Sequence, residues 1–301
     1  MTHSASAARI GGLAAAAAFA AWGLLPIYWK ALGTVPAAEI LCHRIVWSVP
    51  FVALLLAATH RLGEIRTILA DRRTTGLLTV SALLVGSNWF VYIWAVNNAH
   101  IVESSLGYYI NPLVSMLLGF IFFRDRLNRV QGLAIGFAVC GVLLELWQFG
   151  RIPWIALVLA VTFGLYGLVR KIVNTEALPG LFVETAIMGV PAAAFLLFRE
   201  SQGLAALGHG TLAMDALLVG AGAVTSLPLA AFAFGARRLR LTTVGVLQYL
   251  SPTGMFALGV FVYGEEFTAA HLGTFAFIWA GVALYMLDSI VRLRRTPIAK
   301  V

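Results

Sequence analysis

Ten long apolar runs separated by short gaps are the feature that most limits how this chain can fold. A hydrocarbon core about 30 Å thick requires about 20 apolar residues in helical form to cross it. Backbone polar groups in lipid must be satisfied within the segment, and the runs lack the alternating pattern of barrel strands, so they predict transmembrane helices. We place these helices at residues 10–29, 36–58, 75–95, 102–123, 130–147, 153–170, 179–198, 214–235, 242–263 and 271–290.

Composition agrees with a chain whose solvent is lipid. Of its 301 residues, 60% are apolar and 11% are charged, whereas soluble chains carry about 25% charged residues. The net charge of +8 could indicate nucleic-acid binding, but the Lys and Arg residues are concentrated in the short gaps between apolar runs. We therefore predict an all-α membrane protein whose partner is the lipid bilayer and not nucleic acid.

The distribution of positive charge predicts the orientation of the helices. With the N-terminus in the cytoplasm, nearly all of the 21 Lys and Arg residues lie in cytoplasmic segments. The opposite side then holds Lys30, Arg151 and Arg199, and Arg44 lies within a helix. This asymmetry follows the positive-inside rule. Ten helices then place both termini in the cytoplasm.

The two halves of the chain repeat each other. Residues 109–112, Tyr-Ile-Asn-Pro, match residues 249–252, Tyr-Leu-Ser-Pro, and Leu118-Gly119 matches Leu258-Gly259 in the same register. We predict two five-helix repeats at residues 1–147 and 148–301. Because five is odd, the repeats enter the membrane with opposite polarity, which suits alternating access with a small-molecule site near the midplane.

Ionisable residues within the second and fourth helices are costly in lipid and are candidates for a solute or coupling site. Glu39 and His43 lie four residues apart on one helical face, while Arg44 points elsewhere. Glu103 begins the fourth helix on the same side of the membrane, so we expect an Arg44–Glu103 ion pair. This cluster could anchor the bundle, contact the solute or couple protons to transport.

Glu184 is a further carboxylate inside an apolar run, about five residues into the seventh helix. It is a candidate coupling residue by the same argument of cost. The alternative is a side chain that faces water at the cytoplasmic end of the helix.

Amides and aromatic hydroxyl groups gather in the third, fourth and ninth helices. Such groups suit a cavity for amphipathic solutes, although they also serve as contacts between helices and as interfacial anchors. The candidate binding residues are Asn88, Tyr109, Asn111, Gln248 and Tyr249.

Prolines and glycines within the apolar runs predict bends and close contacts. Pro112 and Pro252 occupy equivalent repeat positions and could act as hinges, or could give fixed bends needed for packing. Gly132 and Gly136 form a GxxxG motif, which predicts a close helix contact.

The chain carries no Walker motif, GxSxG motif, HExxH motif or clustered acidic metal site. We therefore expect a protein that is not an enzyme, needs no cofactor and transports by a secondary mechanism. A non-transporting membrane enzyme or receptor is the alternative. The oligomeric state is open between monomer and homodimer.

Several longer stretches carry a resemblance to a known family. They are residues 23–30, 35–48, 88–98, 103–113, 166–171 and 275–279. In these stretches, and over almost its whole length, the chain resembles the RarD branch of the EamA-type transporters in the drug/metabolite transporter superfamily. The resemblance implies a 5+5 inverted repeat, a location in the bacterial inner membrane and export of small metabolites or drugs. It brings no settled set of binding residues.

Overall fold

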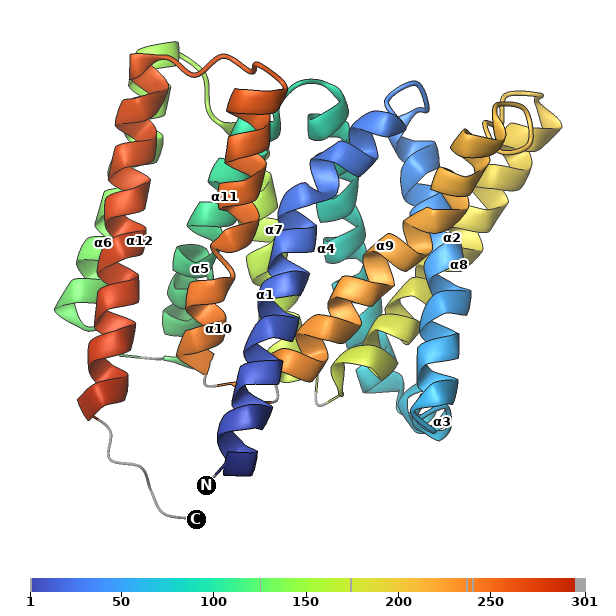
Figure 1. The fold of residues 1–301 in the computed structure, drawn as a ribbon, viewed down its shortest axis with the longest axis horizontal. Helices are drawn as coiled ribbons and strands as arrows, with labels where there is room; N and C mark the ends of the chain where they lie inside the picture. Colours follow the sequence, from blue (N-terminus) through green and yellow to red (C-terminus); the bar gives the residue numbers. More distant parts are fainter. Residues whose placement is uncertain (1, 125, 174, 237, 240, 296–301) are drawn as a thin grey trace.

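The computed structural model describes residues 2–124, 126–173, 175–236, 238–239 and 241–295 (Figure 1). Within these ranges the chain is helical without any strand, and ten helices are long and apolar enough to cross a membrane. The predicted all-α membrane fold is confirmed. In chain order the elements are α1 (Thr2–Ala31), α2 (Ala37–Ala58), α3 (Gly63–Ala70), α4 (Arg72–Asn97), α5 (Ile101–Phe123), α6 (Arg129–Phe149), α7 (Trp154–Ile172), α8 (Ala177–Ser201), α9 (Leu212–Ala236), α10 (Leu241–Leu247), α11 (Leu250–Ala257), the π-helical turn η1 (Leu258–Val262) and α12 (Ala269–Arg295).

The predicted spans agree closely with the observed ones. The largest differences, about three residues at one end, are between predicted 75–95 and observed Arg72–Asn97, and between predicted 179–198 and observed Ala177–Ser201. Two features were not predicted. A short helix, α3, lies in the gap after α2, and the ninth span is broken between α10 and α11.

Local hydrogen bonds explain where several helices begin and end. At the start of α6, the Asn128 side chain accepts from the Gln131 amide, and the Gln131 side chain accepts from the Asn128 amide, which is a capping box. Asp71 caps α4 in a similar way by accepting from the backbone amides of residues 73 and 74. The Thr74 hydroxyl also donates to Asp71 and lowers the pKa of that carboxyl. Gly150 ends α6 with a positive φ of 64°.

The two halves run in opposite directions through the bundle. The start of α1 and the end of α12 lie on one face, which we call the terminal face, and the α1–α2 loop (residues 32–36) lies on the other, the opposite face (Figure 1). α1 begins at the terminal face, whereas its counterpart in the second half, α7, begins at the opposite face. The predicted 5+5 inverted repeat is therefore confirmed.

Packing between the halves has the reciprocity of a pseudo-two-fold axis. α1 packs against α9 and α11 of the second half, and its counterpart α7 packs against α4 and α5 of the first. The equivalent helices α2 and α8, α5 and α11, and α6 and α12 also contact each other directly. The core of the molecule is thus the interface between the two halves.

Glycines allow the outer helices α6 and α12 to approach closely. A Cβ on Gly141 would lie 3.1 Å from the carbonyl oxygen of Thr274, and one on Gly281 would lie 2.7 Å from that of Ala134. These two contacts are related by the repeat. By contrast, Gly132 and Gly136 are exposed, and no described atom would lie within 4 Å of a Cβ there. The prediction of a close helix contact at the GxxxG motif is therefore wrong for contacts within this chain.

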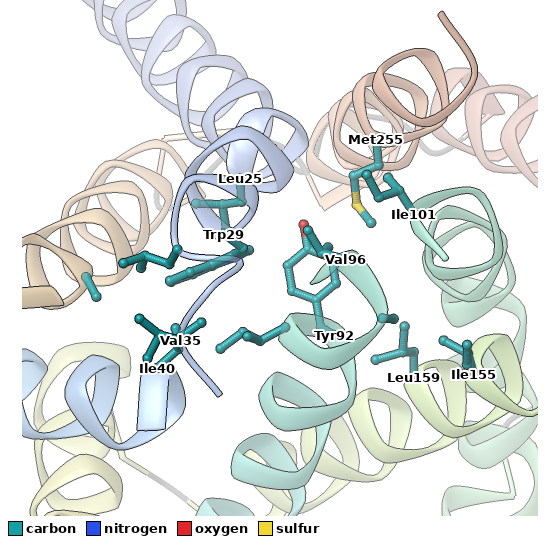
Figure 2. Close-up of a cluster of buried hydrophobic side chains, with 14 of the residues drawn as sticks. Leu25, Trp29, Val35, Ile40, Tyr92, Val96, Ile101, Ile155, Leu159 and Met255 are labelled. Carbon is teal, nitrogen blue, oxygen red and sulfur yellow. The ribbon is translucent and has the colours of Figure 1, made fainter. Parts of the chain in front are cut away.

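Buried apolar side chains close the bundle near the opposite face. Figure 2 shows members of this group from three helices: Trp29 from α1, Tyr92 from α4 and Met255 from α11. We call this group the opposite-face cluster. It consists of Leu25, Trp29, Leu32, Val35, Ile40, Tyr92, Ile93, Ala95, Val96, Ile101, Ile155, Leu159, Leu218, Ala221 and Met255.

Candidate functional site

A cavity of about 170 Å³ lies between the two halves and is called the central cavity here. Side chains from α1, α2, α4, α5, α7, α8, α9 and α11 line it, together with Gln248 at the helix break, whereas the outer pair α6 and α12 contributes none. Its walls include Trp22, Arg44, Asn88, Trp89, Asn111 and Gln248. A site formed by both repeats is what the inverted topology predicts.

The structure divides the twelve predicted residues into two groups. The residues that line the central cavity are Arg44, Asn88, Asn111, Pro112, Gln248 and Pro252. The residues that lie outside it are Glu39, His43, Glu103, Tyr109, Glu184 and Tyr249.

Arg44 is the only charged side chain among the residues that line the central cavity. It is 5% exposed, and its guanidinium carbon lies 3.9 Å from the ring centre of Trp89 and 5.2 Å from that of Trp29. Its Nε and Nη1 atoms have no hydrogen-bond partner among the described residues. The aromatic rings stabilise the cation, and the hydrogen-bond donors Nε and Nη1 remain unused.

The predicted Arg44–Glu103 pair is wrong. Glu103 accepts a hydrogen bond from the Ile155 amide at 3.1 Å, at the start of α7, and lies 3.9 Å from the His100 ring. A carboxylate is stabilised by the free amides at a helix N-terminus, so Glu103 is satisfied without a cation from α2. Arg44 instead faces α1 and α4 through its two tryptophan contacts.

Glu103 also lines a second cavity of about 260 Å³ on the opposite face. Besides apolar residues, its walls include His100, Glu145, Arg151, Glu265 and His271. Glu265 accepts from the amides of Ile101 and Val102, both at 2.8 Å, and so caps α5 as Glu103 caps α7. Glu103 and Glu265 therefore both accept hydrogen bonds from free amides at the N-termini of helices.

Glu39 and His43 are buried on another side of α2. Glu39 accepts from the Ala206 amide at 2.6 Å and from Arg199 at 2.9 Å, which ties α2 to the α8–α9 connection. His43 is 3% exposed, and its ring nitrogens have no described partner. Glu39 is thus a scaffold residue in this structure, and the Glu39–His43 face does not reach the central cavity.

Glu184 is fully buried between α8 and α4, rather than facing water as the alternative prediction held. The Ser81 hydroxyl donates to it at 2.6 Å, and Arg170 of α7 lies 3.6 Å away. These contacts join three helices near the terminal face.

Tyr109 and Tyr249, which are equivalent in the two repeats, meet at the pseudo-two-fold axis. Their rings stack with centres 6.2 Å apart, and the Tyr109 hydroxyl is 2.8 Å from that of Thr253. Both belong to a buried cluster next to the central cavity. Their equivalence was predicted, but their mutual contact was not.

Asn88 lines the central cavity with its hydrogen bonds already occupied. Its amide nitrogen donates to the Leu159 carbonyl at 3.0 Å and to Thr162 at 2.9 Å, and its oxygen accepts from Tyr108 at 3.1 Å. Asn88 therefore links α4, α5 and α7. Among the polar wall residues, Arg44 differs from it in having donors to spare.

The ninth span is broken where it passes the central cavity. Pro252 has no amide hydrogen to donate to the Gln248 carbonyl, which accepts from the Ser251 amide at 3.3 Å instead. Gln248 lies in the break and lines the cavity. The equivalent proline, Pro112, lies inside the unbroken helix α5. Non-helical backbone at membrane depth occurs where it lines a cavity, as here.

Sequence reasoning missed some cavity residues. Thr225 of α9 is 3% exposed and lines the cavity, and its hydroxyl donates to the Ala221 carbonyl. A sequence signal was available, since Thr225 and Ser226 interrupt an apolar run just before Pro228. The aromatic residues Tyr92 and Phe163 carry no such signal, because aromatic residues are common throughout transmembrane helices.

Comparisons with known proteins agree with this architecture. A model of the EamA-like transporter family matches the chain twice, over residues 9–147 and 151–287. Protein RarD of Escherichia coli (strain K12) is 45% identical over 288 residues, which are 96% of this chain and 97% of that protein. An uncharacterized transporter of Vibrio cholerae is 43% identical over 290 residues, 96% of each chain.

A solved crystal structure of a protein at 19% identity matches with a TM-score of 0.59, covering 96% of this chain and 99% of that one. At that identity the match demonstrates a shared fold alone.

Proposed function

Because the chain belongs to the EamA-like transporter family, we propose that it moves small metabolites or amphipathic drugs through the central cavity. The observation that carries the proposal is a cavity lined by both inverted repeats. Such a site can open to either side when the repeats exchange their shapes. We place the protein in the bacterial inner membrane and take residues 1–147 and 148–301 as its repeats.

The size and walls of the central cavity support a small, amphipathic solute. Its volume of about 170 Å³ is close to that of a buried cavity of about 150 Å³ that accommodates benzene. Aromatic rings such as Trp22, Trp89 and Phe163 supply apolar contact, and Asn111 and Gln248 add polar groups. This mixture of apolar walls and few polar groups is typical of small-molecule sites.

The difference between the two repeats supports alternating access. α5 is continuous through Pro112, whereas its counterpart is interrupted before Pro252. The opposite-face cluster closes one end of the molecule with buried side chains. We infer that this conformation is closed toward the opposite face, which the charge distribution assigns to the outside of the cell. We propose export as the direction of transport, as the family resemblance implies.

Flux in proteoliposomes tests this proposal with purified full-length protein and a broad solute library. Thr225→Trp should fill the central cavity and abolish the flux of any transported solute. Leu143→Trp is the matched control, because Leu143 is 56% exposed on α6, away from the cavity. Wild-type protein that is folded but silent across the library would count against transport.

A second variant covers the case in which the large tryptophan prevents folding. In a background without Cys42 and Cys140, the Ser251→Cys protein should lose flux after reaction with a methanethiosulfonate reagent. Ser251 lines the cavity, so the attached group occupies the solute path. Unchanged flux after complete labelling would contradict a route through this cavity.

A further inference from the structure

Arg44 brings a positive charge into the central cavity without a described counter-charge. No carboxylate of the described residues lies within 4.0 Å of it, and the other residues lining the cavity are uncharged. Arginine stays protonated in proteins, so the charge persists at any physiological pH. A buried cation that lacks a partner is strongly unfavourable. An anion that enters the cavity would supply the missing counter-charge.

Arg44 lines the central cavity and has hydrogen-bond donors without a described acceptor. The Arg44 guanidinium lies against the rings of Trp89 and Trp29, and its buried Nε and Nη1 atoms have no described hydrogen-bond acceptor. Each of these donors shares one edge of the guanidinium with Nη2, and two parallel donors on one edge match the two oxygens of a carboxylate. The nearby Tyr92 hydroxyl also lacks a described partner.

The charge balance favours a monoanion. One cation in a low-dielectric cavity neutralises one negative charge, whereas a second negative charge would be buried without a partner. The rest of the wall is largely aromatic or aliphatic, including Trp22, Phe163 and Met255. A matching solute therefore has one carboxylate and a compact apolar or aromatic body.

We propose that Arg44 is the anion-binding residue of the central cavity and that the transported solutes are small organic monocarboxylates. This proposal rests on the proposed transport function, which it deepens by naming the class of solute. Neither the second cavity nor the Arg170–Glu184 contact takes part in it.

Equilibrium binding to the purified full-length protein, followed by tryptophan fluorescence, tests the proposal. The probes are benzoate, its neutral analogue benzamide, the cation benzylamine and inorganic phosphate. Because hydrogen bonds to a charged group stabilise a complex by an amount equivalent to roughly tenfold or more in affinity, benzoate should bind at least about tenfold more tightly than benzamide. Benzylamine and phosphate should bind more weakly than benzoate.

Variants of Arg44 then assign the preference to this side chain. Arg44→Gln should abolish the preference for benzoate over benzamide, and Arg44→Lys should retain part of it, since lysine keeps the charge but not the two parallel donors. Arg151→Gln is the matched control, because it removes a positive charge from the second cavity and should leave the preference unchanged. If Arg44→Gln does not fold, the partial loss in Arg44→Lys carries the test.

Equal binding of benzoate and benzamide, or an unchanged preference in Arg44→Gln, would overturn the proposal. Tight binding of phosphate in place of benzoate would also overturn it. Flux in proteoliposomes distinguishes the proposed transport function from the proposed class of solute. Transport of neutral solutes that is blocked by Thr225→Trp but not by Arg44→Gln would preserve the transport function and reject the monocarboxylate class. Binding of benzoate that depends on Arg44, without flux of any solute, would support Arg44 as an anion-binding residue and reject the transport function.

Discussion

Two buried charges on one helix have different roles at the scale of single residues. Glu39 is satisfied by the Ala206 amide and the Arg199 guanidinium, so it belongs to the scaffold between α2 and the α8–α9 connection. Arg44, less than two turns further along α2, has unused donors and faces the central cavity. The insertion cost of Glu39 is therefore offset by partners within the protein, whereas for Arg44 we propose that a bound anion offsets it.

This contrast predicts opposite effects on stability. Glu39→Gln should lower the free energy of unfolding by about 1–3 kcal/mol, because two donors lose a charged acceptor. Arg44→Met should leave stability unchanged or raise it, since removing an unpaired buried cation outweighs the loss of about 1–2 kcal/mol of cation–π contact. Denaturant unfolding in detergent measures both.

The control for this prediction is Glu200→Gln, at a carboxylate that is 54% exposed and pairs with an exposed His209. Its stability should change by no more than about 0.5 kcal/mol, because exposed ion pairs contribute little. A loss in Arg44→Met as large as that in Glu39→Gln would mean that Arg44 has a structural partner.

Sequence reasoning identified Glu39, Arg44, Glu103 and Glu184 as unusual, because the cost of a charge in lipid can be read from position alone. It did not find their partners, since these depend on how each helix is rotated about its axis. Glu103 caps α7, and Glu39 binds Arg199, which had been assigned to a loop. Small rotations decide such pairs, and the distribution of apolar residues around these helices is too even to set the rotation.

At the scale of helices, glycine determines which pairs can approach closely. A Cβ on Gly222 of α9 would overlap the backbone of Trp47 in α2, so the two helix backbones touch there. No described atom would lie within 4 Å of a Cβ on Gly136 of α6. Glycine motifs in the sequence do not distinguish these cases, because both residues lie in apolar runs.

The two glycines therefore respond differently to substitution by alanine. Gly222→Ala should destabilise the protein by about 1–3 kcal/mol, because α2 and α9 must separate to accept the methyl group. Gly136→Ala should stabilise it by about 0.5–1 kcal/mol through the higher helix propensity of alanine. Thermal unfolding in detergent compares the two, and equal effects would contradict the close α2–α9 contact.

Helix positions were predicted well because hydrophobic length is a strong signal in lipid. The break between α10 and α11 was not, since Pro112 and Pro252 occupy equivalent positions but only the second interrupts its helix. The proline motif thus marks where a helix can break. Whether it does so depends on the conformation of the whole bundle.

At the scale of the whole molecule, the proposed alternating access predicts a second conformation in which the two inverted repeats exchange their shapes. In the present conformation the second half is broken before Pro252, and α5 is continuous. The exchanged state would have the break in α5 and a continuous ninth span. The repeat and its polarity were predicted from sequence, whereas the conformation was not, because the internal symmetry of the sequence does not show which half carries the break.

The two prolines should therefore bias the equilibrium in opposite directions. Pro252→Ala restores a donor for the Gln248 carbonyl, which favours a continuous ninth span and so the exchanged state. Pro112→Ala favours a continuous α5 and so the present state. A cysteine at Thr225, in a background without Cys42 and Cys140, reports access to the central cavity. Its labelling by an impermeant thiol reagent added outside spheroplasts should rise with Pro252→Ala and fall with Pro112→Ala. Changes in the same direction would mean that the prolines act as fixed bends rather than as a pair of hinges.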